Sequence, residues 1–262
     1  MLETSCMIMQ TVQYEYVEET IGPDGRWVQN GQKGVMLFES YGSGVCLAQS
    51  AEGAYILTAN HVVAPMEQTQ TLPDLTGAMR RILTKISENT GIVISYSHDA
   101  EHNLIFETVP AEILASNEHD IALVRTSTPV AIHMGGRQFT LRTVNRTGSV
   151  SEGDTVFGIG YRILPRVESD YLNVNERLIR SFDVGFVKSI GDPNERSDDE
   201  INYISMNTQQ GNSGGPVFNQ NFELVGLRAH VFFTRTSNIE DMINAYAIRD
   251  FLQTSGYARL LQ

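Results

Sequence analysis

Short strand-like segments, repeated at intervals of about 8–12 residues, are the feature that most limits how this chain can fold. Gly, Asn, Asp and Pro interrupt them; Gly22-Pro23-Asp24-Gly25, for example, predicts a hairpin turn between Tyr14–Ile21 and Trp27–Val28. A sheet built from alternating β/α units would need a helical segment after most strands, and the sequence lacks this alternation. The pattern therefore predicts an all-β chain built from barrels or sandwiches.

Two stretches are predicted to be helical. Leu75–Glu88 places apolar side chains at three- and four-residue spacing with Arg and Lys between them, and Ile248–Leu261 is the second stretch. The turn-rich region Thr126–Gly136 divides the strand-like segments into two halves. A chain of 262 residues is long enough to bury a large core without disulfide bonds.

Charge and the N-terminal sequence limit the expected partners and compartment. The formal net charge of −12 repels phosphate backbones and anionic lipid heads, so neither nucleic acid nor a membrane is an expected partner. Glu3 precedes any apolar run and the first basic residue is Arg26, which is the reverse of a secretory signal. We therefore expect a cytoplasmic protein, cellular or encoded by a virus or phage, in which Cys6 and Cys46 are reduced.

The hexapeptide Gly-Asn-Ser-Gly-Gly-Pro at residues 211–216 is the first segment with a chemical signature. Glycine loses the most backbone entropy on folding, so three glycines around one serine are costly in a strand or a helix. They suit a tight turn whose backbone amides point outward. Such a turn could place the Ser213 hydroxyl beside the amides of Gly211 and Ser213, which would then form an oxyanion hole. The alternative is a plain glycine-rich turn.

Two further segments carry the groups that a serine nucleophile needs. His61 follows the strand-like Ile56–Ala59, and Asp120 opens the apolar Ile121–Val124; each alone is typical of a structural residue. A serine hydroxyl needs a base to accept its proton, imidazole suits that role, and a carboxylate fixes the imidazole tautomer. Together the segments predict a catalytic triad of His61, Asp120 and Ser213.

At these segments the sequence resembles the trypsin-like serine proteases and, within them, the HtrA/Deg-type branch. The resemblance runs from about Gly42 to Ile248, and the motifs that carry it agree in order and spacing. They are Gly42–Val45, Tyr55–Val63, Pro110–Ile113, Asp120–Leu123, Gly153–Val156, Gly158–Gly160, Val184–Val187, Gly211–Pro216 and Leu224–Leu227.

The resemblance implies two six-stranded Greek-key β-barrels of the chymotrypsin type, followed by a C-terminal helix. Residues 34–135 would form the first barrel, with His61 and Asp120, and residues 136–262 the second, with Ser213 and the helix. Residues 1–33 would form an N-terminal hairpin, either packed on the first barrel or used in a homo-oligomer as in Deg-type trimers. The implied activity is a serine endopeptidase that acts on proteins or peptides through an acyl-enzyme and needs no cofactor or metal.

The sequence departs from the family pattern at three places. Asn212 replaces the aspartate that in many secreted relatives pairs with a newly cut N-terminus, so that activation route is not expected. The chain ends soon after Ile248, which predicts that no PDZ domain follows. The interval between His61 and Asp120 is long for the Deg pattern, and the helix predicted over Leu75–Glu88 would fill it.

Alignment of segments with the family suggests where the side chain before the cleaved bond (P1) would bind. The S1 pocket and the strand that pairs with substrate would comprise Asn207, Thr208, Arg228, Ala229, His230 and Val231. No acidic residue lies at the pocket base, so Lys or Arg at P1 is not expected. An inward Arg228 would favour Glu or Asp at P1; alternatively, its side chain points to solvent or binds a structural carboxylate.

Two competing hypotheses come from other classes of protein. His98-Asp99-Ala100-Glu101-His102 crowds potential metal ligands together, but it lies between strand-like segments and not on a helix, so a solvated turn is the expected structure. The main alternative to an endopeptidase is a catalytically quiet protease-fold module that binds extended peptides or scaffolds an assembly. Such a module has no need of all three triad residues.

Overall fold

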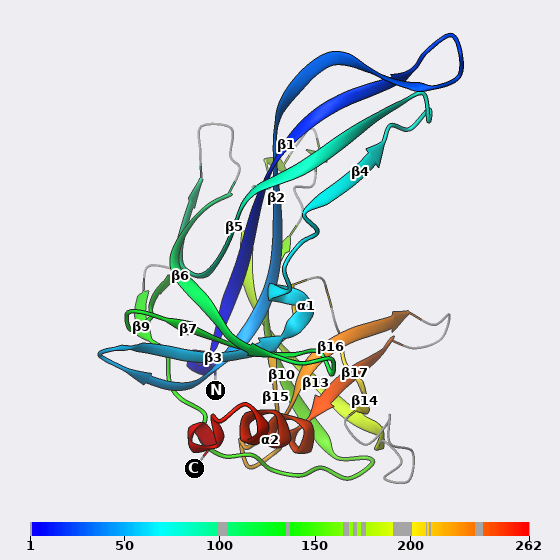
Figure 1. Cartoon of the computed structure of the whole chain (residues 1–262). Helices are drawn as coiled ribbons and strands as arrows, with labels where there is room; N and C mark the ends of the chain where they lie inside the picture. The colour runs from blue at the N-terminus through cyan, green and yellow to red at the C-terminus, as the bar shows by residue number, and fades with distance from the viewer. Residues whose placement is uncertain are drawn as a thin grey trace. The chain divides into compact units, whose positions relative to one another are not determined.

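Nearly all of the regular structure in the computed structural model is β-strand (Figure 1). The structure describes residues 2–261 except 99–103, 135–136, 165–167, 170–171, 174–176, 191–200, 208, 210 and 234–237. The chain divides into two compact units. Unit 1 comprises residues 1–9, 41–63 and 91–262, and unit 2 comprises residues 10–40 and 64–90.

The strands are β1 (Ser5–Ile21), β2 (Trp27–Ser50), β3 (Gly53–Ala59), β4 (Thr69–Pro73), β5 (Met79–His98), β6 (Leu104–Ser116), β7 (Ile121–Thr126), β8 (Ala131–Met134), β9 (Arg137–Thr140), β10 (Thr155–Leu164), β11 (Glu168–Ser169), β12 (Leu172–Asn173), β13 (Arg177–Ile190), β14 (Ile201–Ser205), β15 (Pro216–Phe218), β16 (Leu224–Phe233) and β17 (Asn238–Asn244). The helices are α1 (Asn60–Val63) and α2 (Ala245–Thr254), with 3-10 turns η1 (Leu2–Thr4) and η2 (Ala258–Leu261).

The first barrel is built from the strand series β1-β2-β3-β7-β6-β5, whose ends are joined by a β1–β5 pairing. Its central strands β3 and β7 are apolar along almost their whole length because both of their faces are buried. Ile56 and Val124 face a core inside the barrel, whereas Leu57 and Leu123 face a second core that also receives residues of the second barrel. The burial of both faces fixes the register of these two strands.

The second barrel is closed, with the strand order β10-β13-β14-β17-β16-β15. Small aliphatic residues and methionines, among them Val156, Ile204 and Met242, fill its interior. The cores of both barrels lie in unit 1, and the core that the barrels share also includes Ile248 and Phe251 of α2. The predicted all-β fold with a C-terminal helix is confirmed.

The C-terminal helix begins earlier and ends earlier than the predicted Ile248–Leu261. It starts at Ala245 because the Asn244 side chain accepts hydrogen bonds from the amides of Tyr246 and Ala247, both at 3.0 Å. It ends at Thr254, and the remaining predicted residues form the separate turn η2.

The helix predicted over Leu75–Glu88 is wrong. The segment belongs to unit 2, where β4 and β5 form an antiparallel hairpin with Thr69 opposite Thr84 and Pro73 opposite Arg80. The Asp74 side chain closes the turn by accepting hydrogen bonds from the Thr76 hydroxyl and the Met79 amide.

Contacts between strands explain why the apolar spacing did not produce a helix. Leu83 is fully buried beside Val12 and Tyr14, whereas Ile86 is 56% exposed, so these apolar residues do not share one buried face. The intervening Arg80 and Arg81 form ion pairs with Glu19 and Glu18 of β1 and lie over the rings of Trp27 and Tyr16. Cross-strand pairs of this kind stabilise a sheet.

The hairpin predicted around Gly22–Gly25 is confirmed. Strand β1 ends at Ile21, β2 begins at Trp27, and the Gly22 amide donates to the Arg26 carbonyl at 2.7 Å. Gly25 has a φ of 76°, a value that glycine adopts without strain.

Cys6 and Cys46 are free thiols in the core of the first barrel. Both are fully buried, and burial raises the pKa of Cys6 well above its ordinary value and that of Cys46 to about 12. Because the thiolate is the reactive form, these thiols are chemically inert in the folded protein.

We therefore expect native protein to react very slowly with an aromatic disulfide reagent at neutral pH. A pKa raised from 9.0 to about 12 lowers the thiolate fraction of Cys46 roughly a thousandfold, and burial blocks access as well. The measurement is thiol release followed by absorbance, with protein in guanidinium chloride as the control, where both cysteines should react at once. Rapid reaction of either thiol in the native protein would contradict this burial.

Candidate active site

His61 is delivered to the site by the end of a buried strand. Strand β3 runs to Ala59 and leads directly into the short helix α1, whose Val62 and Val63 are buried in the core of the first barrel. The His61 side chain is 38% exposed. The buried valines therefore fix the backbone while the imidazole remains accessible.

Asp120 lies in the turn between β6 and β7 and is held against His61 by several contacts. Because Ala59 is opposite Ile121 in the β3–β7 pair, the residues that flank these positions are neighbours. The Asp120 carboxylate accepts the His61 amide at 2.8 Å and lies 2.7 Å from His61 Nδ1, and its carbonyl accepts the Asn60 amide at 2.8 Å. The carboxylate thus orients the ring through Nδ1, and Nε2 lies on the side away from Asp120.

The backbone of Asp120 has a φ of 62°, in the left-handed region. Non-glycine residues seldom adopt this conformation, although Asp and Asn tolerate it better than others. The turn that imposes it is closed by Asn117, whose side chain accepts the Ile121 amide and whose own amide donates to the Ile121 carbonyl. Strained residues of this kind cluster at functional sites.

The segment Gly211–Pro216 forms a tight turn that requires glycine at two positions. Gly211 and Gly214 have φ values of 94° and 78°. A Cβ atom on Gly214 would collide with the Ser43 carbonyl and the Thr58 side chain. The serine-bearing turn of the second barrel therefore packs against the end of β3, just before His61.

The backbone amides of this turn divide into two groups. Those of Asn212, Gly214 and Gly215 donate to the carbonyls of Gln209, Arg228 and Asn212. Those of Gly211 and Ser213 donate to no oxygen of the residues that the structure describes. These two amides flank Asn212 and have no acceptor among the described residues, so they are suited to bind an oxyanion.

Ser43 holds this turn in place, and the sequence analysis did not identify it as a site residue. Its hydroxyl donates to the Gly211 carbonyl at 2.7 Å and accepts the Tyr161 amide at 2.8 Å, and its amide donates to the Ser213 carbonyl at 2.7 Å. Ser43 thus binds the carbonyls of Gly211 and Ser213, the same two residues whose amides are free of acceptors in the described part of the chain. The only signal for this role was the motif Gly42–Val45.

The Ser213 hydroxyl donates to the Ala229 carbonyl at 3.1 Å. The structure therefore pairs two of the predicted triad residues, His61 and Asp120, and gives the Ser213 hydroxyl a backbone partner on β16.

Asn212 is fully buried, and its side-chain carbonyl accepts the Ser181 hydroxyl at 3.0 Å. Its Nδ2 atom has no hydrogen-bond partner among the described residues. An uncharged amide can be buried here at moderate cost, whereas a carboxylate would need a cation beside it.

Arg228 is also fully buried, and its side chain binds two carboxylates. Nε donates to Glu240 at 3.0 Å, and Nη1 donates to Asp183 at 2.9 Å. Its Nη2 lies 3.5 Å from the Asn207 carbonyl. The Arg228 side chain therefore binds structural carboxylates, which is one of the predicted alternatives to a side chain that binds P1. No sequence signal pointed to Asp183 on β13 or to Glu240 on β17, the strand that follows β16.

The structure describes only some of the other predicted site residues. Asn207 is exposed, and Ala229 is buried on β16. Thr208, the side chains of His230 and Val231, and most of the segment 98–102 lie outside the described residues. Within the described part of the chain, no three His, Cys, Asp or Glu side chains are grouped as metal ligands. No described helix is long and apolar enough to span a membrane.

Comparison with known proteins identifies the family. The sequence matches the model of the trypsin-like peptidase domain over residues 42–227, which is more than half of the chain. The chain belongs to the trypsin-like peptidase family. The predicted resemblance to the trypsin-like proteases is thereby confirmed, and the matched residues include His61, Asp120 and Ser213.

The search of curated proteins gave no match. Among solved structures, the chain is similar to the HtrA-type protease AlgW with a decapeptide, at 17% identity and a TM-score of 0.49. The similarity covers 93% of this chain and 62% of that one, so the trypsin-like peptidase described here spans less than two thirds of the length of its structural neighbour.

The burial of Asn212 predicts how stability changes when this residue is replaced by the aspartate of the secreted relatives. Asn212→Asp should lower the free energy of unfolding by about 3 kcal/mol at neutral pH, because it buries a carboxylate without a cation. Urea unfolding measures this change, and Asn145→Asp on the exposed surface is the matched control. The loss should shrink at acidic pH, where the carboxyl is neutral; an undiminished stability at pH 7 would mean that a cation reaches this position.

Proposed function

We propose that this peptidase is a serine endopeptidase that hydrolyses peptide bonds through an acyl-enzyme on Ser213. The observation that carries the proposal is the combination of an oriented imidazole with two unpaired amides beside the serine. His61 is held by Asp120 at 2.7 Å, and the amides of Gly211 and Ser213 have no acceptor among the described residues. A binding module needs neither arrangement.

In the proposed mechanism, the Ser213 hydroxyl leaves the Ala229 carbonyl by rotation about its Cα–Cβ bond and donates to Nε2 of His61. The oxygen attacks the substrate carbonyl as the imidazole takes the proton, and Asp120 stabilises the imidazolium. The amides of Gly211 and Ser213 stabilise the negative charge on the tetrahedral intermediate. The imidazolium then protonates the leaving amine, and water releases the acyl group by the reverse sequence.

The proposed substrate is a protein or peptide segment in extended conformation. The backbone of Arg228 is already bound to Gly214 and Gly215, so substrate would pair with the part of β16 that follows it, Ala229–Val231. Asn207 and Thr208 would form the other wall of the S1 pocket.

A fluorophosphonate probe tests this function directly. Wild-type protein should be labelled at Ser213, and Ser213→Ala should abolish labelling, because the probe reacts only with a serine activated by a base. Ser151→Ala, which removes an exposed hydroxyl elsewhere, should label like the wild type. Labelling is read by gel fluorescence, and the modified peptide is identified by mass spectrometry.

Folded protein that no fluorophosphonate labels, at any pH between 6 and 9 and in the presence of unfolded protein substrate, would favour the alternative of a quiet peptide-binding module. Labelling that survives Ser213→Ala would assign the nucleophile to another residue.

The pairing of Arg228 predicts that acidic residues at P1 are disfavoured. The Arg228 guanidinium is already bound by the carboxylates of Asp183 and Glu240, and we expect these two carboxylates to repel a third one brought close to them. In peptides that differ only at P1, kcat/KM for Glu should be at least about tenfold below that for Gln, a difference of about 1.4 kcal/mol. Asp183→Asn should narrow this ratio; faster cleavage after Glu than after Gln would contradict the proposal.

A further inference from the structure

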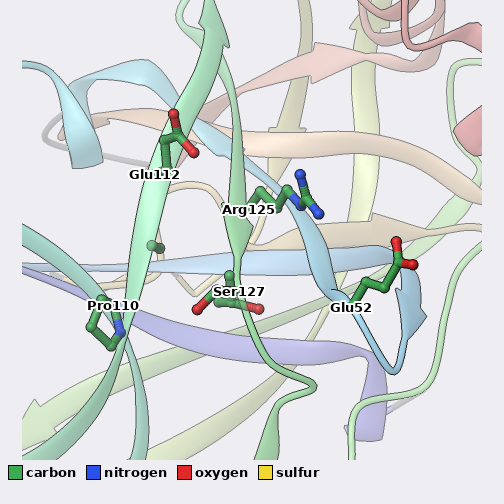
Figure 2. A pocket seen from close by; sticks show the side chains of 7 residues that line it. Glu52, Pro110, Glu112, Arg125 and Ser127 are labelled. Atoms are coloured by element: carbon green, nitrogen blue, oxygen red, sulfur yellow. The ribbon is translucent and has the colours of Figure 1, made fainter.

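A polar pocket of about 400 Å³ lies on the first barrel (Figure 2). It is at the C-terminal end of β7, whereas Asp120 lies at the N-terminal end of that strand. Its volume is in the range of small-molecule sites. The residues that line it are Glu52, Pro110, Ala111, Glu112, Arg125, Thr126 and Ser127. None of them belongs to the proposed catalytic machinery.

Strand pairing builds the pocket around Arg125. Tyr55 of β3 and Glu112 of β6 are each directly opposite Arg125, so the three side chains share one face of the sheet. The Arg125 guanidinium lies over the Tyr55 ring at 5.5 Å, and Tyr55 in turn lies against Tyr257, with 6.3 Å between ring centroids. The aromatic stack therefore fixes the direction of the guanidinium without neutralising its charge.

The charged groups of the pocket are not paired with one another. The Arg125 side chain makes no hydrogen bond and no ion pair with the residues that the structure describes, and its enclosed Nε atom has no partner. The carboxylates of Glu52 and Glu112 likewise form no ion pair within the described residues. Figure 2 shows the Arg125 side chain extending between them. Other arginines of the chain, such as Arg81 and Arg228, are paired with carboxylates.

The enclosed Nε atom of Arg125 has no partner among the described residues, which is unfavourable, and an anion that binds the guanidinium through two parallel hydrogen bonds would offset this cost. A carboxylate group of a ligand meets this requirement. Glu52 and Glu112 leave the pocket with one positive and two negative charges, so a ligand that carried only a carboxylate would be repelled. The ligand must also carry positive charge.

We propose that this pocket binds a basic amino-acid unit, with its α-carboxylate on Arg125 and its cationic groups on Glu52 and Glu112. Free arginine or lysine has this chemistry, and so does the C-terminal Arg or Lys of a peptide. Bidentate contact with the carboxylate provides the specificity, and the flanking glutamates select a cationic side chain.

Isothermal titration calorimetry on the Ser213→Ala protein tests the proposal without cleavage of the probe and independently of the catalytic mechanism. The probes are L-arginine, the tripeptide Gly-Gly-Arg, its C-terminal amide, and agmatine, which lacks the carboxylate. At least one of L-arginine and Gly-Gly-Arg should bind, and which of them binds more tightly identifies the source of the ligand. The amide and agmatine should bind at least about tenfold more weakly, as expected for loss of a charge-assisted pair.

Matched variants locate the site. Arg125→Gln should weaken binding by about tenfold or more, and Glu112→Gln should also weaken binding of the same probes. The control variants Arg137→Gln and Glu152→Gln remove the same charges from exposed surface and should have no effect. Circular dichroism confirms that each variant is folded. Failure of both arginine probes to bind, equal binding of agmatine, or equal loss in the control variants would overturn the proposal.

Discussion

The pairing of β3 with β7 is the constraint on which the rest of the site depends. Both strands are buried on both faces, so a slip of one residue would exchange Leu57 and Leu123 with residues that face the inside of the barrel. The same register places the residues after Ala59 beside those before Ile121, and the hydrogen bonds between His61 and Asp120 follow from it. The core thus determines the geometry of two polar side chains that lie at its edge.

The serine-bearing turn of the second barrel is held from two directions, one of them from strand β2 of the first barrel. On one side Ser43 engages the carbonyls of Gly211 and Ser213, and on the other Arg228 brackets Gly214 and Gly215 with its backbone. Strand β13 contacts both the turn and Arg228. Its Ser181 hydroxyl donates to the Asn212 side chain, and its Asp183 carboxylate accepts from the Arg228 side chain. An uncharged Asn212 is compatible with this arrangement, in which the buried charge is concentrated at Arg228.

Local sequence predicted the fold class and the segments of the site, because turn glycines and apolar strands leave local signals. The apolar spacing of the segment Leu75–Glu88 fits a helix, whereas its structure depends on pairing with the distant β1, to which Arg80 and Arg81 form ion pairs. The roles of Ser43, Asp183 and Glu240 were equally out of reach. Each depends on a partner in another strand or turn, and no spacing along the chain identifies that partner.

Arg228 and Arg125 show how the same residue type acquires opposite roles in one fold. Arg228 enters a closed barrel, where an unpaired charge would be very costly, and two carboxylates of the chain are built in to hold it. Arg125 lies near the end of the central strand β7, where its charge is oriented by Tyr55 and left without a protein anion among the described residues. The first arrangement is complete within the chain, whereas in the second a bound ligand is proposed to supply the carboxylate.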